Sequence, residues 1–441
     1  MANSDSSDDG QNRRIDWLAE QIAYHSDLYY NQAKTEIPDS EFDALWDELK
    51  QLDAMHPQLQ RVGAEIDPGT VKVDHMFPMR SLNKGTADED IDHFVRESSL
   101  EATRFISQPK LDGSALSLEY RKGRLVRAAT RGSGNRGEDV TKNARRVENV
   151  PGTLGAEVDV HIRGEVVMRK STFEEQYADV SPNPRNLAAG ALRQKKAEGK
   201  ANASDLVFLA YDAKFPDELS RHPDSSPPPD ANNDSEILSW LTETAGVIPA
   251  PWIITESIEP SELTSGLCKE TEKWTSQRED YEFEIDGLVF KVDDLSKRDL
   301  LGMTAHHPRW ALAWKFPPEE ATSVLLHVDW QTGRTGTITP VARIAPQRVG
   351  GVTVENTTLH NLGEVERLDI HIGDKIKIVR RGDVIPKIEA SLGPATQQDL
   401  EGRIHADGEP FAGLLPERKP IQAPSLCPAC DGPVEIEGAF I

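Results

Sequence analysis

The chain has 441 residues, and its 50 basic against 74 acidic side chains give a formal net charge of −24 at pH 7. At roughly 150 residues per domain, this length predicts about three domains. No apolar run approaches the roughly 20 residues that span a bilayer, and the amino terminus lacks the apolar core of a signal peptide. Three cysteines cannot form a disulfide scaffold. We therefore expect a cytoplasmic protein with no membrane partner, and the acidity argues only weakly against nucleic acid because local patches decide such binding.

The two ends of the chain differ in type from its middle. Residues 1–13 are polar and are expected to form a disordered tail. Within 14–69, apolar residues recur at helical spacing in two stretches, which predicts a pair of helices. Residues 319–404 carry short strand patterns punctuated by Gly and Pro, which predicts a small closed barrel. Residues 405–441 are expected to form a tail.

Short strands and turns fill residues 70–318. A hairpin is predicted around Lys122-Gly123, and helices are predicted at 171–178 and 235–245. The Pro-, Ser- and Asp-rich stretch 216–236 predicts a surface insertion. Further buried strands are predicted for the segments VDVHIRGEVVM, DLVFLAYDAKF, EFEIDGLVFKV and ALAWKF.

The strongest chemical signal is Lys110-Leu111-Asp112-Gly113, at a strand-to-turn junction. Alone it is most simply an exposed lysine before an Asp-Gly turn. A lysine amine attacks phosphorus only when it is neutral, so its ordinary pKa of about 10.4 must fall. Lys291 and Lys315, which end two apolar strands, are cations that could lower it, and snorkelling to solvent is their alternative role. More motifs follow Lys110 in order: ATRGSGNRGEDVT (129–141), IRGEVVM (162–168), NPRNLAAGALRQ (183–194), EIDGLVFK (284–291) and ALAWKFPPE (311–319).

With this ordered series the chain resembles the NAD+-dependent DNA ligases, within the covalent nucleotidyltransferase superfamily. The resemblance runs from about residue 15 to the end. It implies a multidomain α+β fold. Its parts are a helical domain that binds the nicotinamide mononucleotide (NMN) half of NAD+ (14–69), a nucleotidyltransferase (ATP-grasp-like adenylation) domain of antiparallel sheets with helices (70–318), an OB-fold β-barrel (319–404), and a zinc-module stub and tail (405–441).

The resemblance also implies a reaction. Lys110 would take AMP from NAD+, pass it to the 5′-phosphate of a nick in duplex DNA, and the 3′-hydroxyl would displace it, in replication and repair. Mg2+ or Mn2+ would be held through water by Asp112, Glu165 and Asp286, since carboxylates suit hard cations. We expect a monomer. Two alternatives remain: an ATP-dependent nucleotidyltransferase, and a truncated form that self-adenylates and binds nicks but seals poorly.

Nucleotide contacts are implied by the same resemblance. Lys291 and Lys315 would contact the α-phosphate, and Gln108 departs from the Glu that many members carry there. The adenylation motifs would contribute Ser81, Leu82, Gln108, Arg131, Glu165, Tyr211, Lys291 and Lys315. The helical pair, which favours NAD+ over a nucleoside triphosphate, would contribute Tyr29, Tyr30, Asp39, Phe42 and Asp43. Helix-core, turn and capping roles are the alternatives for Phe42, Asp39 and Asp43.

Phosphate and DNA contacts are implied for Arg185, Arg193, Arg278, Arg334, Arg380 and Arg381. The segment 374–387 is locally basic, which favours a track for backbone phosphates, with a solvated charged hairpin as the alternative. Cys427 and Cys430 have the spacing of half a zinc site, and no second pair follows. The resemblance implies Zn2+ only if further C-terminal cysteines are present, so we expect both thiols to be metal-free in a loose tail.

Overall fold

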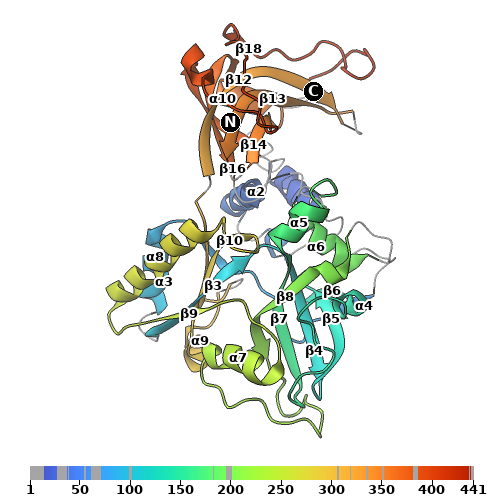
Figure 1. Cartoon of the computed structure of the whole chain (residues 1–441), viewed down its shortest axis with the longest axis vertical. Helices are drawn as coiled ribbons and strands as arrows, with labels where there is room; N and C mark the ends of the chain where they lie inside the picture. The colour runs from blue at the N-terminus through green and yellow to red at the C-terminus, as the bar shows by residue number, and fades with distance from the viewer. Residues whose placement is uncertain are drawn as a thin grey trace, which may run out of the picture. The chain divides into compact units, whose positions relative to one another are not determined.

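The fold was analysed in a computed structural model of the chain. It describes residues 14–26, 37, 39–53, 56–60, 71–98, 102–181, 183–194, 201–304, 307–317, 319–333, 336–349, 352–380, 386–436 and 438. The chain forms two compact units, shown in Figure 1. The first holds Met1–Glu36 and Glu41–Phe316, and the second holds Ile37–Ser40 and Pro317–Ile441.

A helical pair lies near the amino end, as predicted. A helix over residues 14–26 packs on α2 (Asp39–Leu52) through Leu18, Ile22 and Leu49, which are all fully buried. The spacing of the first two is one helical turn, so both lie on one face. The short helix η1 (Pro57–Gln60) completes this small core.

A five-stranded sheet carries the KxDG motif. Its order is β2 (Asn83–Gly85), β11 (Ala311–Lys315), β10 (Ile285–Val292), β3 (Arg104–Leu111) and β9 (Ile253–Glu256), with one parallel pair, β2 with β11. Helices α3 (Asp88–Ser98) and α8 (Pro260–Gln277) pack on one face through a core that includes Phe105 and Phe290. Helix α8 buries Leu263 and Leu267 in this core.

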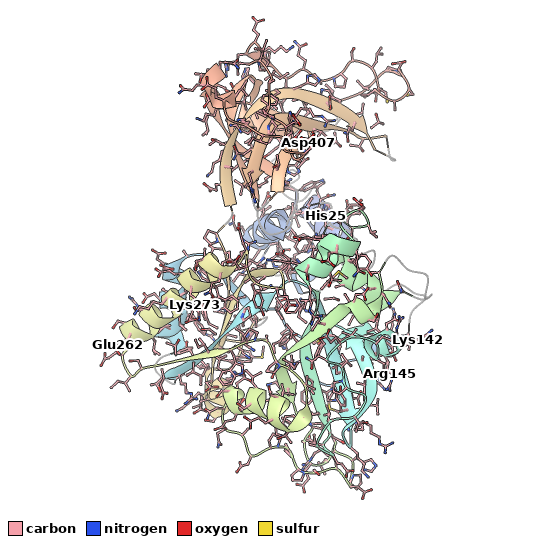
Figure 2. All side chains as sticks on the ribbon, in the orientation of Figure 1. His25, Lys142, Arg145, Glu262, Lys273 and Asp407 are labelled. Carbon is pink, nitrogen blue, oxygen red and sulfur yellow. The ribbon has the colours of Figure 1, made fainter. Side chains whose placement is uncertain are left out.

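The outer side of α8 is charged, since Glu262 and Lys273 are exposed (Figure 2). Because side chains alternate across a strand, Ile106, Gln108 and Lys110 lie on the face of β3 opposite Phe105. Lys291 of β10 pairs in register with Ile106 and shares that face. We call this surface the Lys110 face.

A second, four-stranded antiparallel sheet has the order β5 (Arg124–Thr130), β4 (Ser114–Arg121), β7 (Val160–Met168) and β8 (Leu206–Lys214). The predicted hairpin joins β4 to β5, with positive φ at Lys122 (47°) and Gly123 (69°). Positive φ at both central residues matches the twist of paired strands. Strands β1 (Lys72–Asp74) and β6 (Arg136–Glu138) form a separate, two-stranded antiparallel sheet.

Helices surround the second sheet and its core. They are α4 (Thr141–Ala144), α5 (Lys170–Gln176), α6 (Pro184–Arg193), η2 (Ala203–Asp205), and α7 (Asp234–Trp240) with its π-helical extension η3 (Leu241–Ala245). Helix α9 (Leu295–Leu301) follows β10 and packs on that strand of the first sheet. Two predicted helices, at 171–178 and 235–245, are present near those bounds. The prediction that 216–236 is all surface is wrong at its end, because Asp234 is fully buried and Ser235 is 3% exposed.

The second unit contains the predicted barrel. Five strands close in the order β12 (Glu319–Thr332), β13 (Ile338–Val349), β14 (Val352–Thr358), β17 (Lys387–Pro394) and β16 (Asp374–Arg380). Helix α10 (Leu362–Leu368) follows the third strand, and alternate residues such as Leu325, Ile344 and Ile376 fill the interior. The short elements β15 (His371–Ile372), η4 (Gln397–Leu400) and β18 (Lys419–Pro420) complete it. Nowhere in the described ranges is a helix both long and apolar enough to cross a bilayer.

Candidate active site

The side chains of Lys110 and Lys315 both lie close to the carboxylate of Asp286. Its Nζ lies 2.9 Å from Asp286 Oδ2, and Lys315 Nζ lies 4.0 Å from the same oxygen. The strand register explains this meeting, because Lys110 and Lys315 both pair with Gly287, the residue after Asp286. Three adjacent strands thus bring together three charged groups from distant motifs.

The pKa of Lys110 is set by its carboxylate neighbours. Burial acts to lower the pKa of this amine, but Asp286, followed by Asp112 and Glu165, outweighs burial and raises it above the ordinary value of lysine. The expectation that nearby cations lower this pKa is therefore wrong for the ligand-free chain. The reason is distance, since an opposite charge at hydrogen-bond range stabilises the ammonium.

Glu165 behaves differently from the two aspartates near it. It lies on β7, opposite Ala115 of β4. Burial raises the pKa of Glu165 to about 8, although Lys110 and Arg131 act to lower it. At neutral pH this side chain is therefore mostly a neutral carboxylic acid, which can donate a hydrogen bond.

Arg131 lies between Glu165 and the segment before β2. Its Nη2 donates to Ser81 Oγ at 2.8 Å and its Nε to the Met79 carbonyl at 3.1 Å. The structure thus brings the predicted residues Arg131 and Ser81 together. Leu82, the next residue, is half-buried.

Two of the predicted arginines lie on α6. This helix begins after Asn183, whose side chain accepts from the Asn186 N–H at 2.8 Å. Arg185 in its first turn lies 2.8 Å from Asp112 Oδ1, beside the Lys110 motif. Arg193 in its last turn pairs instead with Glu138 at 3.0 Å. The third, Arg278, places its guanidinium 5.2 Å from the centre of the Phe316 ring.

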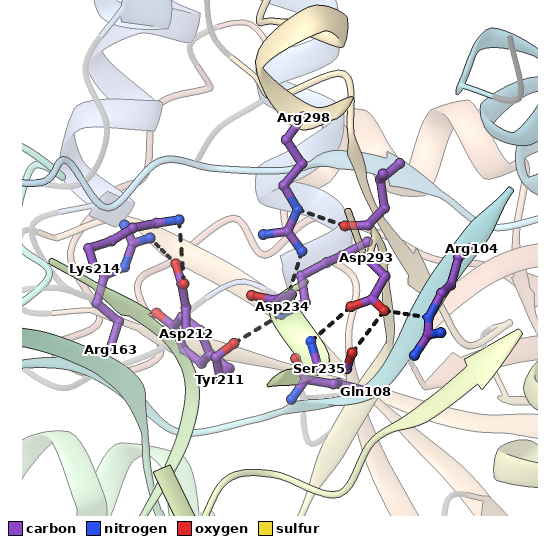
Figure 3. A network of polar contacts seen from close by, with 12 residues as sticks. Arg104, Gln108, Arg163, Tyr211, Asp212, Lys214, Asp234, Ser235, Asp293 and Arg298 are labelled. Atoms are coloured by element: carbon purple, nitrogen blue, oxygen red, sulfur yellow. Dashed lines mark hydrogen bonds and ion pairs between the residues drawn. The ribbon is translucent and has the colours of Figure 1, made fainter. Parts of the chain in front are cut away.

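Lys291 is not brought to the Lys110 and Lys315 pair. It pairs with Ile106, four residues before Lys110 on β3. Its Nζ lies 2.5 Å from Asp234 Oδ2 and donates to the Tyr211 carbonyl at 3.0 Å. Figure 3 shows the polar network that surrounds Asp234 and Tyr211.

Two further predicted nucleotide contacts lie near Lys291. Gln108 is 2% exposed, and its Nε2 donates to the Ala250 carbonyl at 3.4 Å. Tyr211 lies on β8 of the other sheet, and burial, followed by the charge of Glu165, raises the pKa of its hydroxyl. Contacts from β7 and β8 therefore place the second sheet against the Lys110 face.

The carboxylates near Lys110 do not form a direct magnesium site. Across the described ranges, no group of three His, Cys, Asp or Glu side chains could hold a metal ion. Asp112 and Asp286 each pair with a cation, and Glu165 is mostly protonated at neutral pH. In the ligand-free chain two of these carboxylates are thus in ion pairs, although Asp286 Oδ1 is buried without a hydrogen-bond partner in the described part of the chain.

Several predicted residues of the helical pair and the barrel lie outside the described part of the chain. Tyr29, Tyr30, Arg334 and Arg381 lie outside the described residues, as do the side chains of Asp39, Asp43 and Arg380. Phe42 is described, and it packs in the helical core with its ring centre 6.1 Å from that of Trp46.

The segment around Cys427 is ordered, so the prediction of a loose tail is wrong. The Cys427 N–H donates to the Gly432 carbonyl at 2.8 Å, and the Asp431 N–H donates to the Cys427 carbonyl at 2.9 Å. Cys427 Sγ also lies 3.4 Å from the hydroxyl of Thr332, on β12 of the barrel. A tight turn anchored to the barrel therefore presents both thiols.

Sequence reasoning missed Asp234 and Arg298, whose side chains meet at 2.9 Å. Asp234 was hidden in a polar stretch that predicts surface. The capping-box spacing of Asn233 and Glu236 is the signal that could have found the helix start, since both reciprocal bonds are present. Nothing local in the sequence marks the burial of Arg298, which is 4% exposed.

Comparison with known proteins gives three matches to family models. Residues 69–319 match the NAD-dependent DNA ligase adenylation domain, residues 322–399 match the NAD-dependent DNA ligase OB-fold domain, and residues 8–64 match the DNA ligase-like N-terminal NAD+-binding domain. These matches agree with the order of helical pair, two sheets and barrel in the structure.

Similar curated proteins carry the name DNA ligase. One from Marinobacter nauticus is 37% identical over 459 residues, which cover 97% of this chain and 62% of that protein. One from Acinetobacter baylyi is 38% identical over 440 residues, which cover 95% of this chain and 60% of that protein. The chain thus spans about three fifths of the length of these relatives. An ATP-dependent DNA ligase from bacteriophage T7, solved with ATP, is similar with a TM-score of 0.30 and 15% identity, over 71% of this chain and 98% of that one.

Proposed function

The chain belongs to the NAD-dependent DNA ligase family, and from that premise we propose that it seals nicks in duplex DNA through an AMP group carried on Lys110. The nicks have a 5′-phosphate and a 3′-hydroxyl, and the setting is replication and repair. The observation that carries the proposal is the meeting of Lys110 and Lys315 on Asp286 Oδ2. In this arrangement Lys110 is the nucleophile, Asp286 is the proton acceptor, and Lys315 is the cation that contacts the phosphate.

The first step forms a bond between Lys110 Nζ and the adenylyl phosphorus of NAD+. The bond from that phosphorus to the NMN oxygen breaks, and NMN leaves. Asp286 Oδ2, at 2.9 Å, is the acceptor for the proton of the Lys110 ammonium. The phosphates of NAD+ attract Lys315, which weakens its hold on Asp286 and makes that carboxylate more basic. Lys315 then neutralises charge that develops on the phosphate oxygens.

The nucleoside is bound by groups on both sheets. Arg131 and Ser81 face the ribose together, and the neutral Glu165 donates a hydrogen bond to it. Tyr211 flanks the adenine, and Gln108 offers it an amide. We now assign Lys291 to the nucleoside end of the site, because its contacts lie four strand positions from Lys110. The match of residues 8–64 to an N-terminal NAD+-binding domain supports a role for residues 14–69 in binding the NMN half of NAD+.

The later steps act on DNA. AMP passes from Lys110 to the 5′-phosphate, and the 3′-hydroxyl then attacks that phosphate and releases AMP. Arg185, which pairs with Asp112 next to Lys110, would contact the 5′-phosphate. Arg193, Arg278 and the arginines of the barrel, Arg334, Arg380 and Arg381, would contact the backbone. Residues 70–318 would adenylate, and residues 319–404 would hold the duplex. We propose a monomer in the cytoplasm.

The mass of the intact protein tests the first step. Incubation with NAD+ should add one AMP, and addition of NMN should remove it. A Lys110→Ala variant should gain nothing, whereas a Lys273→Ala variant, changed on the exposed side of α8, should still be labelled. Label gained from ATP and not from NAD+, or label that persists in the Lys110→Ala variant, would refute the proposal.

Nick sealing is a separate measurement. A duplex with one labelled 5′-phosphate nick, incubated with the adenylated protein and no free NAD+, should yield a sealed strand. Protein that loses AMP to the 5′-phosphate without joining the strands would show the second step and reject sealing by this chain.

A further inference from the structure

We propose that Asp234 is a positioning residue that holds the Lys291 ammonium on the Lys110 face, where it binds the nucleoside part of NAD+. This inference rests on the proposed function and deepens it. It also concerns a residue that lies outside every motif singled out in the sequence. The observations that carry it are the contacts of Lys291, the support behind Asp234 and the strand register.

Lys291 is held with one donor to spare. It is 7% exposed, and its Nζ lies 2.5 Å from Asp234 Oδ2 and 3.0 Å from the Tyr211 carbonyl. An ammonium has three N–H donors, so these two contacts leave a third for a ligand. Because Lys291 shares a face with Lys110, that donor belongs to the same site.

Asp234 is itself rigidly supported (Figure 3). It is the first residue of α7, its backbone N–H donates to the Asp293 carbonyl at 2.8 Å, and its Oδ2 lies 2.9 Å from Arg298 Nη2. Arg298 donates from Nε to the Val292 carbonyl at 2.6 Å and lies 4.4 Å from the centre of the Trp310 ring. The backbone hydrogen bond of Asp234 and its ion pair with Arg298 therefore hold the carboxylate beside Lys291.

The charge of Asp234 also keeps Lys291 a cation. Burial acts to lower the pKa of Lys291, and the carboxylate of Asp234 is the strongest group that opposes this. Arg298 adds to the lowering, so loss of the carboxylate would leave two buried cations without their shared partner. Lys291 would then give up its proton or move, and in either case the nucleoside would lose a charged donor.

The strand register indicates a second position, residue 108, from which a carboxylate could pair with Lys291. Gln108 pairs with Val289, so it is the diagonal neighbour of Lys291 on the Lys110 face. Diagonal neighbours lie roughly 7–8 Å apart, within reach of long side chains. A glutamate at position 108 could therefore hold Lys291 without Asp234. This chain has a neutral amide there, so the carboxylate in direct contact with Lys291 is that of Asp234, while Asp212 acts on Lys291 as a further negative charge.

The test measures self-adenylation in single turnovers over a range of NAD+ concentrations. Asp234→Asn should raise the NAD+ concentration for half-maximal rate by about tenfold or more, with the maximal rate within about threefold of wild type. Adding Gln108→Glu to that variant should return the half-maximal concentration to within about threefold of wild type. Urea unfolding of each variant reports its folding.

Asp293→Asn is the matched control. Asp293 is also fully buried in the network of Figure 3, where it accepts from Arg104 Nε at 2.7 Å and Ser235 Oγ at 2.8 Å, but it holds no lysine of the Lys110 face. It should lose folding stability while the half-maximal NAD+ concentration stays within about twofold. An equal shift in Asp293→Asn, or a double variant no better than Asp234→Asn, would overturn the proposal.

A second readout does not depend on the reaction. The pKa of Lys291, followed by NMR of isotope-labelled lysine, should fall in Asp234→Asn and recover in the double variant. An unchanged pKa would overturn the positioning role. Wild-type protein that takes no AMP from NAD+ would refute the proposed function alone, and the NMR result would still decide the role of Asp234.

Discussion

Lys110 of β3 and Asp286 of β10 form an ion pair of 2.9 Å across 176 positions of sequence. The proposed nucleophile is therefore stored as an ammonium in the free chain. Its partner sits at a point where the two strands are irregular in register, between Ile285 and Gly287. Breaking this pair is the first requirement of the proposed chemistry, so its strength should be visible in the reactivity of the amine.

The first prediction concerns the Asp286→Asn variant. Asp286 is the strongest of the three carboxylates that raise the pKa of Lys110, so its loss should lower that pKa by at least about one unit. Acetylation of Lys110 by acetic anhydride, followed by peptide mass spectrometry from pH 6 to 10, should show the reactive form at lower pH. The exposed pair of Asp74 and Arg136 provides the control, Asp74→Asn, which should not move the profile. An unmoved profile in Asp286→Asn would contradict the pairing.

The second prediction follows from the raised pKa of Glu165. The folded value of about 8 exceeds the ordinary 4.5, so between these values the unfolded chain loses a proton that the folded chain keeps. Stability from this group is thus fully present below pH 4.5 and is lost as pH rises toward 8. The Glu165→Gln side chain cannot titrate. The unfolding free energy of this variant, relative to that of wild type, should therefore increase as pH rises. Urea unfolding at pH 5, 6.5 and 8 measures this difference, and a constant difference would reject the shift.

The sequence predicted the individual strands and turns better than it predicted which of them lie in contact. Apolar runs ending in lysine located β10 and β11, and the hairpin at Lys122-Gly123 followed from its turn residues. Lys315 reaches the carboxylate of Asp286 beside Lys110 and Lys291 does not, although both lysines lie at or next to the ends of similar strands. The difference lies in register, because Lys315 pairs with Gly287 and Lys291 pairs with Ile106. The apolar pattern of a strand fixes which of its faces is buried, but it does not identify the residue that lies opposite on a strand from a distant segment.

The direction in which the pKa of Lys110 is shifted also could not be predicted from the sequence. The motifs supply cations and carboxylates together, and Coulomb energy falls with distance. Only the geometry shows that Asp286 lies within hydrogen-bond range of Lys110. Asp234 was missed for a related reason, since composition describes a polar stretch as a whole and its last residues turn inward. Burial of a carboxylate depends on partners that lie elsewhere in the chain.

The third prediction concerns Gly113, which follows Asp112. A Cβ there would lie 2.2 Å from the Val166 carbonyl oxygen and 2.8 Å from Val167 Cγ1, so β4 and β7 would have to separate. Gly113→Ala should cost about 1–3 kcal/mol of unfolding free energy and abolish AMP transfer to Lys110. Gly190 of α6 is the matched control, since a Cβ there meets nothing within 4 Å. Gly190→Ala should stabilise by about 0.5–1 kcal/mol and be labelled normally. Equal behaviour of the two variants in urea unfolding and in labelling would contradict the steric argument.

The fourth prediction concerns the cysteine turn on the barrel. A hydrogen bond from the Thr332 hydroxyl, with bonds from backbone N–H groups of the turn, lowers the pKa of Cys427 to about 7. Burial raises the pKa of Cys268 to about 11. Because the thiolate is the reactive form, iodoacetamide at pH 7 should alkylate Cys427 far faster than Cys268. Thr332→Val keeps the shape of the side chain and removes the hydroxyl. It should therefore slow the alkylation of Cys427 and leave the alkylation rate of Cys268 unchanged. Peptide mass spectrometry over time gives both rates in one sample, and a Thr332→Val variant with unaltered Cys427 would show that the turn backbone alone sets the pKa.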